Sequence, residues 1–237
     1  MPDHSSLLAR IPGIIHGFGD KSALLPPLLA PYSDTSPEKK QVHGTRIVEV
    51  RQPMQQCGEA DGFFTRTPGI LISVLTADCL PVMFSRLDGQ AVGVVHAGWR
   101  GLLAGILEQM AEQICQQDQT ENWIAAIGPA ARACCYQVTE ALIADFTQAL
   151  PFPATVISPS YRQLDLAAIA EHKLRALGFH AVDRAGGCTI CSLDPDPNAL
   201  DKFNYTSYRR TSQRREQDPT YPTITGRHQH SGIIISG

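Results

Sequence analysis

The sequence predicts an α/β fold of the α+β kind, in which a mixed β-sheet is layered with helices. Three observations support this prediction. Apolar runs of strand length alternate with segments of helical period along the chain. Two of these runs are joined by Asp88-Gly89, a hairpin turn signal that makes the pair antiparallel. The alternation lacks a strict βαβ rhythm, which disfavours a doubly wound parallel sheet.

The first half of the chain contains mostly strands by its pattern. Residues 21–40 hold four prolines and no periodicity, so we expect them to form a surface loop. The β-branched run at 69–76 predicts a buried strand. The other expected strands of this half are 13–18, 46–50, 80–87 and 90–96.

The second half mixes helices with strands. Apolar residues at helical spacing after Gly101 predict an amphipathic helix that starts near that glycine. A helix is expected at 139–150, capped by Thr139, and another at 165–178, with Asp165 near its start and Gly178 as its stop. The expected strands are 122–128, 154–158, 180–184 and 231–236.

Composition limits the function classes. The 237 residues, 43% of them hydrophobic, suffice for a large core, and we expect one domain over residues 1–237. A net charge of −3 without a basic block disfavours nucleic-acid binding, and no apolar run is long enough for a membrane span. Without a signal peptide, and with an odd count of seven cysteines, we expect a cytoplasmic protein with free thiols.

Three residues at strand ends attract attention because of their chemistry. These are His43 in "QVHG", Cys79 in "TADCLPV" and His96 in "VVHAGWRG". Cys79 and His96 bracket the Asp88-Gly89 hairpin, whose two ends return close together, whereas His43 must be brought in by the fold. Imidazole and thiolate are ligands that zinc prefers, and three of them leave a fourth position open. The alternative is a buried cysteine with two hydrogen-bonded core histidines.

Several stretches together resemble one known family. They are "QVHGTRIVEV", "ADGFFTRTPGILISVLTADCLPVMF", "GVVHAGWRGLLAGILE", "IGPAARACCYQV" and "FNYTSYRRTS". From about residue 11 to its C-terminus the chain closely resembles the YfiH or laccase-domain family. Members were first called polyphenol oxidases and are now regarded as purine nucleoside phosphorylases with adenosine deaminase activity. One bacterial branch is linked to the editing of peptidoglycan precursors.

The resemblance implies both a fold and a metal site. The fold is the mixed-sheet, layered arrangement shared by YfiH and cytotoxic necrotizing factor, which agrees with the strand pattern. The implied metal ligands are His43, Cys79 and His96. We expect zinc there, with copper as the alternative. A water at the fourth position of zinc has its pKa lowered to about 7.

Neighbouring residues suggest roles in substrate binding. Gly98 lets the backbone turn tightly, the following helix start favours an anion, and Arg100 offers a fork for phosphate. Trp99 either packs or stacks on a base. Asp78 is a candidate general acid or base, or else caps the turn. Arg209 and Arg210 in "SYRR", and Arg227 in "TGR", match family motifs and are candidate anion contacts. The alternative for "YRRTSQRR", which contains Arg209 and Arg210, is a solvated basic loop.

The remaining cysteines and histidines receive structural interpretations. Cys188 and Cys191 have the spacing of a zinc knuckle or a redox motif, but no second ligand pair follows them, so we expect a structural role. Cys134 and Cys135 are expected to be thiols. The remaining histidines considered, expected at the surface, are His4, His172, His180, His228 and His230. The chain departs from the family in "FGDKSALL" and "GPAARACCYQV", and we expect these departures to affect substrate choice.

The leading functional hypothesis is a metal-dependent purine nucleoside phosphorylase with adenosine deaminase activity. Its candidate partners are phosphate and adenosine, inosine or methylthioadenosine, bound by a monomer or weak homo-oligomer. Deamination requires attack of an activated water on C6 of adenine, with Asp78 as the candidate proton shuttle. Phosphorolysis requires attack of phosphate on C1′ of the ribose, oriented by Arg100.

Three other readings are open. A Cys79–His96 or Cys79–His43 pair could act as the nucleophile of an amidase on peptidoglycan precursors. A copper-dependent polyphenol oxidase fits poorly, because a multi-copper oxidase needs several histidine-rich motifs and the chain has eight histidines. The last reading is a non-enzymatic binding module, against which a metal site with an open position argues mildly.

Overall fold

The central layer of the molecule is a mixed six-stranded sheet. The computed structural model describes residues 3–198 and 202–237. The strands of this sheet lie in the order β10-β9-β7-β8-β5-β3, with parallel pairs at both edges and antiparallel pairs between them. Their bounds are β3 Ile47–Glu49, β5 Gly62–Thr65, β7 Leu80–Arg86, β8 Val92–Ala97, β9 Trp123–Ile127 and β10 Ala181–Arg184.

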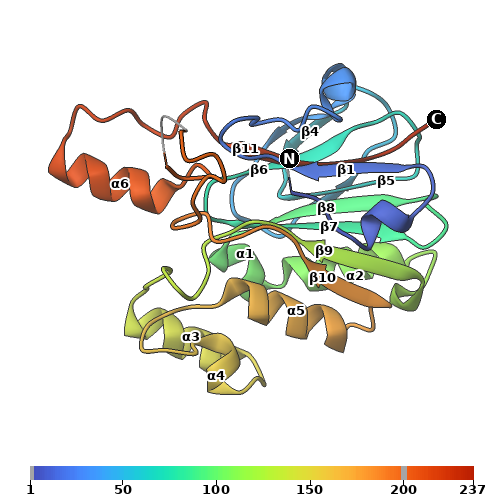
Figure 1. Ribbon diagram of the computed structural model, residues 1–237. Coiled ribbons are helices and arrows are strands. Elements are labelled where there is room, and N and C mark those ends of the chain that lie inside the picture. Colours follow the sequence, from blue (N-terminus) through green and yellow to red (C-terminus); the bar gives the residue numbers. More distant parts are fainter. Residues whose placement is uncertain (1–2, 199–201) are drawn as a thin grey trace.

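A second sheet and a set of helices cover the two faces of the central sheet (Figure 1). The second sheet is antiparallel, in the order β1-β11-β6, with bounds Ile14–Phe18, Gln229–Ile235 and Ile72–Thr76. On the other face lie α1 (Trp99–Ala104), α2 (Ile106–Cys115) and α5 (Leu166–Ala176). This mixed-sheet, layered arrangement confirms the fold class predicted from the sequence.

Strand β9 shows why the central strands are apolar on both sides. Trp123, Ala125 and Ile127 pack among the helices, whereas Ile124 and Ala126 face the second sheet. A strand buried on both faces reads as a continuous apolar run, which is how "NWIAAIG" reads.

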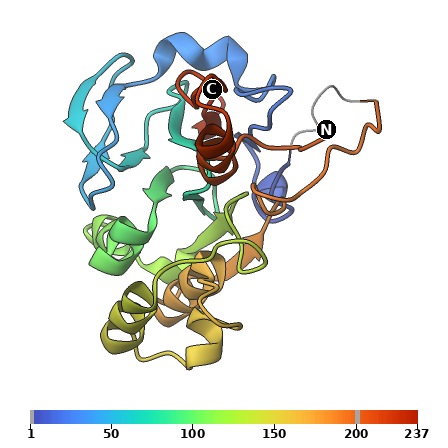
Figure 2. The same cartoon turned by 90° about the vertical axis from the view of Figure 1, so that its left-hand side faces the viewer.

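The remaining elements lie around these layers (Figure 2). Helix α6 projects from the same end of the sheets as the loops that carry the candidate site (Figure 1). The bounds are β2 Glu38–Lys40, β4 Gln56–Glu59, α3 Glu140–Ala149, α4 Ala154–Ile157 and α6 Tyr208–Gln217, with short 3-10 helices at Leu8–Arg10, Ala30–Thr35 and Thr120–Asn122. Residues 21–40 are therefore not all loop, because they contain one of these 3-10 helices and β2.

Capping residues place two helices where the sequence predicts them. The side chain of Thr139 accepts from the N–H of Leu142 at 3.2 Å, and that of Asp165 accepts from Ala168 at 2.9 Å. Gly178 follows α5 with a φ of +82°, as expected for a C-terminal glycine.

Two predictions of local structure are wrong, and a predicted helix is present with different bounds. Residues 154–158 form no strand; Ala154–Ile157 is one helical turn after Pro153, and only Ile157 of that turn is buried against α5. The helix expected from Gly101 begins at Trp99 and breaks at Gly105, which has a φ of +98°. The basic segment "YRRTSQRR" forms α6 instead of a loop, because Ser207 caps it by accepting from the N–H of Arg210 at 3.1 Å.

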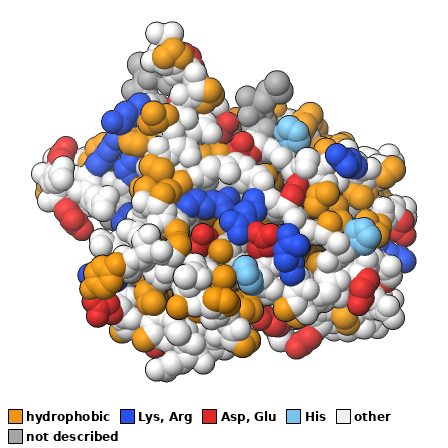
Figure 3. Space-filling model, turned by 60° about the horizontal axis from the view of Figure 1, so that its bottom comes forward, with side chains coloured by type: hydrophobic (Ala, Val, Ile, Leu, Met, Phe, Trp, Pro, Cys, Tyr) orange, Lys and Arg blue, Asp and Glu red, His pale blue; other side chains and the backbone are white. Residues whose placement is uncertain are grey.

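The surface carries mixed charges. Acidic and basic side chains are interspersed on the face shown in Figure 3. Glu171 illustrates such mixing, since it pairs with Arg175 at 2.7 Å and with Arg184 at 2.6 Å. Among the helices of the described residues, none combines the length and the apolar character that a membrane span requires.

Candidate metal centre and its cavity

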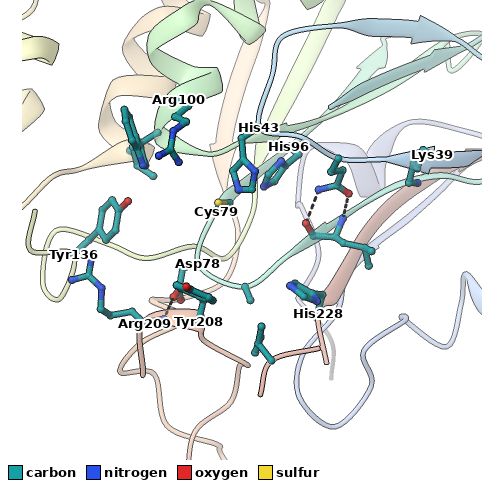
Figure 4. A pocket seen from close by; sticks show the side chains of 16 residues that line it. Lys39, His43, Asp78, Cys79, His96, Arg100, Tyr136, Tyr208, Arg209 and His228 are labelled. Atoms are coloured by element: carbon teal, nitrogen blue, oxygen red, sulfur yellow. Dashed lines mark hydrogen bonds between the residues drawn. The ribbon is translucent and has the colours of Figure 1, made fainter. Parts of the chain in front are cut away.

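The structure brings His43, Cys79 and His96 together at one end of the sheets (Figure 4). Their ligand atoms all lie within 4.8 Å of one another, and the two imidazole rings meet edge-on with centroids 4.7 Å apart. Cys79 immediately precedes β7 and His96 lies on β8, where it pairs with Pro81. The Asp88-Gly89 hairpin therefore does bring Cys79 and His96 together, as the sequence predicts.

Asp61 is the residue of this site that sequence analysis missed. It is fully buried, and its Oδ1 lies 2.8 Å from Nδ1 of His96. The same carboxylate accepts the N–H groups of Val42, His43 and Gly44 at 2.8 to 3.0 Å. The signal in the sequence was an acid directly before the apolar strand β5, where an unpaired carboxylate would be costly.

These contacts orient both histidines. With Nδ1 of His96 held by Asp61, its Nε2 is left to face Cys79. Three hydrogen bonds from backbone N–H groups to Asp61 hold the loop that carries His43. His43 itself has a φ of +61°, which is uncommon for a residue other than glycine. Carboxylate support behind an imidazole is characteristic of histidines that bind metals.

Without a metal ion, the electrostatics of these residues favour a thiolate at Cys79 paired with an imidazolium at His96, which gives up its proton when a metal binds. Burial raises the pKa of Cys79, but hydrogen bonds with His43 and His96 outweigh it and lower that pKa to about 7. Burial lowers the pKa of His96, but Asp61 and Cys79 outweigh it and raise that pKa to about 9. One thiolate and two imidazoles match the ligand types of zinc, so the residues present fit the metal that the family implies.

The three residues lie against a cavity of about 720 Å³ (Figure 4). Arg100, Tyr136 and Arg209 line one side of it, and Lys39 and His228 line the other. His228 was expected at the surface; the return of the chain into β11 places it in this wall instead.

Asp78 also lines the cavity, but other groups occupy its carboxylate. Oδ1 accepts from the hydroxyl of Thr189 at 2.6 Å, and Oδ2 accepts from the hydroxyl of Ser207 at 3.0 Å and the N–H of Arg209 at 2.7 Å. Asp78, which directly precedes Cys79 in the chain, therefore links the start of α6 to the segment that carries this cysteine. Its φ of +94° indicates a backbone held in an unusual conformation by these bonds.

The four candidate anion-binding arginines separate into two pairs. Arg100 lies over the ring of Trp99 at 4.3 Å and Arg209 lies 5.4 Å from the ring of Tyr136, both in the cavity wall. Arg210 and Arg227 lie outside this cavity, beside a separate one of about 90 Å³.

Backbone carbonyls account for the position of the second pair. Arg210 donates to the carbonyls of Thr189 and Ile190 at 2.8 Å each, and Arg227 donates to those of Pro222 and Thr223. These two arginines therefore do not line the main cavity, and their role as anion contacts stays a prediction.

The prediction that Cys188 and Cys191 lack a second ligand pair is wrong. Cys188 and Cys191 do have a second ligand pair, Cys134 and Cys135, and the four sulfurs lie within 4.8 Å of one another. The second pair lies earlier in the chain instead of later, and Cys134 precedes Cys191 by 57 residues.

Comparison with known proteins identifies relatives. The family model of the multi-copper polyphenol oxidoreductase laccases matches residues 31–227. A purine nucleoside phosphorylase of Pseudomonas aeruginosa is 34% identical over 175 residues, which is 73% of this chain and 68% of that protein. The purine nucleoside phosphorylase YfiH of Escherichia coli is 36% identical over 176 residues, which is 72% of this chain and 67% of that protein.

Solved structures share the fold. A Neisseria meningitidis protein, 25% identical, aligns with a TM-score of 0.70 over 89% of this chain and 78% of its own. YlmD from Geobacillus stearothermophilus, 23% identical, aligns with a TM-score of 0.75 over 98% of this chain and 94% of its own. The motifs, the fold and these relatives agree, and the chain belongs to the family of multi-copper polyphenol oxidoreductase laccases that includes YfiH.

Proposed function

We propose that this chain is a zinc-dependent purine nucleoside phosphorylase that also deaminates adenosine in the same cavity. One observation carries the proposal: His43, Cys79 and His96 converge on a cavity of about 720 Å³ whose wall presents two guanidinium groups and the aromatic rings of Trp99, Tyr136 and Tyr208. Relatives of this chain that carry the name purine nucleoside phosphorylase support the substrate class.

The wall residues bind the two substrates in this proposal. Arg100 and Arg209 hold the phosphate as bidentate donors, so that it is oriented for attack on C1′ of the ribose. Trp99 and Tyr136 pack against the purine, because ring faces at a cavity wall suit a flat base. Both contacts hold the substrates over the three metal-ligating side chains.

The metal and its supporting residues serve the chemistry. Zinc supplies a Lewis acid that lowers the pKa of water, which is the activation that attack on C6 of adenine needs. His43, Cys79 and His96 hold the ion, and Asp61 keeps their geometry. We assign Asp78 as a positioning residue instead of a proton shuttle, because hydroxyl and amide donors occupy both of its oxygens.

Elemental analysis of tag-free protein and product analysis by chromatography test the proposal. We expect adenosine to yield inosine, and inosine with phosphate to yield hypoxanthine and ribose phosphate. His96→Ala should abolish both reactions while circular dichroism stays unchanged, because the core holds the fold. If the folded, zinc-loaded wild type turns over no purine nucleoside, the proposal is wrong.

A second candidate uses the same residues without metal. Cys79 lies within hydrogen-bonding reach of His43 and His96, an arrangement in which a thiolate can attack an amide of a peptidoglycan precursor. Hydrolysis of a muropeptide precursor by metal-free protein, inhibited by added zinc, would favour this candidate.

Copper-dependent phenol oxidation is the remaining alternative. Of the two groups of metal-ligating side chains found among residues 3–198 and 202–237, one contains histidine. A multi-copper oxidase needs several histidine-rich sites, so we propose zinc. Oxidation of a phenol by copper-loaded protein, at a rate above that of the free ion, would reverse this choice.

A further inference from the structure

Four cysteines converge at a loop that contacts Asp78 of the candidate active site. Cys134 and Cys135 lie in the turn that follows β9, and Cys188 and Cys191 lie in the turn that follows β10. Their sulfurs lie within 4.8 Å of one another, and those of Cys134 and Cys191 are 3.7 Å apart. A tetrahedral zinc site with Zn–S bonds of about 2.3 Å requires sulfurs about 3.8 Å apart. A disulfide requires about 2.05 Å.

The backbone holds both turns without help from a metal. The N–H of Thr189 donates to the carbonyl of Ala130 at 3.0 Å, and that of Ser192 donates to Cys188 at 2.9 Å. The N–H of Cys135 closes the other turn on the carbonyl of Arg132 at 2.9 Å. Adjacent cysteines point apart in an extended strand, whereas this turn lets Cys134 and Cys135 face the same centre.

Backbone amides also point at one of the sulfurs. The sulfur of Cys188 accepts hydrogen bonds from backbone N–H groups that include those of Ile190 and Cys191. In this C-x-x-C turn the backbone folds around the sulfur of its first cysteine. Hydrogen bonds from backbone N–H groups to a metal ligand orient that ligand. Cys188 is buried while Cys134 and Cys191 are exposed, so the site has an entry path from solvent.

We propose that Cys134, Cys135, Cys188 and Cys191 bind a structural zinc ion, separate from the metal at His43, Cys79 and His96. Four thiolates fill a tetrahedral shell and leave no position for substrate, which makes the site structural. The proposal does not depend on the reaction that the cavity catalyses.

The zinc joins two loops that border the cavity. Thr189, between the two C-x-x-C cysteines, donates to Asp78, and Tyr136, next to Cys135, lines the cavity. Arg210 of α6 donates to the carbonyls of Thr189 and Ile190 within the same loop. The ion therefore positions the wall of the cavity through Asp78 and Tyr136, without touching the substrate.

The test separates the two sites by mutation. Tag-free Cys79→Ala/His96→Ala protein should retain about one zinc per chain, and X-ray absorption should give four sulfur ligands at about 2.3 Å. Adding Cys188→Ser and Cys191→Ser should remove that zinc. Cys115→Ser, which changes an exposed cysteine outside both groups, is the matched control and should leave the zinc content unchanged.

Two results would overturn the proposal. One is a folded Cys79→Ala/His96→Ala protein without zinc, or with fewer than four sulfur ligands. The other is a Cys134–Cys191 disulfide, found by mass spectrometry of freshly alkylated wild type, which would make the group a redox pair. Should the double variant fail to fold, wild type must hold two zinc ions with five sulfur ligands between them. A zinc at the four cysteines without nucleoside turnover would leave this proposal standing and remove only the proposed function.

Discussion

Oδ1 of Asp61 lies 2.8 Å from Nδ1 of His96, and the same buried carboxylate holds the amide groups on either side of His43. One side chain thus orients two of the three candidate metal ligands, although it is not itself a member of that ligand group. A carboxylate in this place also raises the basicity of the imidazole that it supports.

Asp61→Asn should weaken zinc binding by about 10- to 100-fold, because an amide nitrogen cannot accept the N–H groups that now meet the carboxylate. Zinc dissociation constants from competition with a chelator measure this effect. Asp183→Asn is the matched control, since Asp183 accepts from Ser5 and Leu7 far from the cavity. Equal zinc affinities for wild type and Asp61→Asn would contradict the assigned role.

Gly98→Ala should disrupt the metal centre without a change of charge. A Cβ at Gly98 would lie 3.0 Å from Cδ2 of His43 and 3.1 Å from Sγ of Cys79, so one ligand must move. Gly44→Ala is the control within the same site, because its Cβ would meet neighbours at an ordinary 3.6 Å. We expect reduced zinc occupancy in Gly98→Ala only, measured by elemental analysis, and equal occupancy in both variants would refute the crowding argument.

Arg100→Ala should impair phosphorolysis of inosine more than deamination of adenosine, because only phosphorolysis binds an anion before attack. Losing one charge-assisted contact should raise the KM for phosphate by about 10- to 100-fold. Initial rates at varied phosphate measure this effect, with the exposed Arg10→Ala as the control. Equal losses in both reactions would remove Arg100 from the phosphate site.

His16 should make stability depend on pH. Burial lowers its pKa from 6.5 to about 4, with the charge of His4 acting in the same direction and that of Asp183 opposing it. The N–H of Ser5 donates to Nε2 at 2.9 Å, which requires that nitrogen to be unprotonated. The folded state therefore binds this proton less well than the unfolded state. The free energy of unfolding should therefore keep its full value above pH 6.5. It should decrease by up to about 3 kcal/mol as the pH falls toward 4.

Thermal melts at pH 7 and pH 5 test the His16 prediction. The fall in Tm between the two should be smaller in His16→Gln than in wild type, because glutamine can accept from Ser5 without titrating. His180→Gln changes an exposed histidine and should behave as wild type. An unchanged difference in His16→Gln would show that other groups carry the pH dependence.

Features that depend on neighbouring residues could be predicted from the sequence. The Asp88-Gly89 hairpin, and with it the approach of Cys79 to His96, follows from turn chemistry and two apolar runs. The caps Thr139 and Asp165 mark their helices through hydrogen bonds that span three residues. His43 was grouped with these two by its residue type and its place at a strand end, but no local pattern connects it to them, and the family resemblance implied its role as a ligand.

Tertiary structure decided what depends on distant partners. The β-branched run at 154–158 becomes a helical turn that packs against α5 through the buried Ile157. Asp61 gained its role from an amide loop and from a histidine on the adjacent strand. Cys134 and Cys135 met Cys188 and Cys191 because β9 and β10 run in parallel, which places the turns after both strands at the same edge of the sheet. Local hydrogen bonding and apolar periodicity depend on residues close together in the sequence. Contacts between distant residues depend on how the sheets and helices pack.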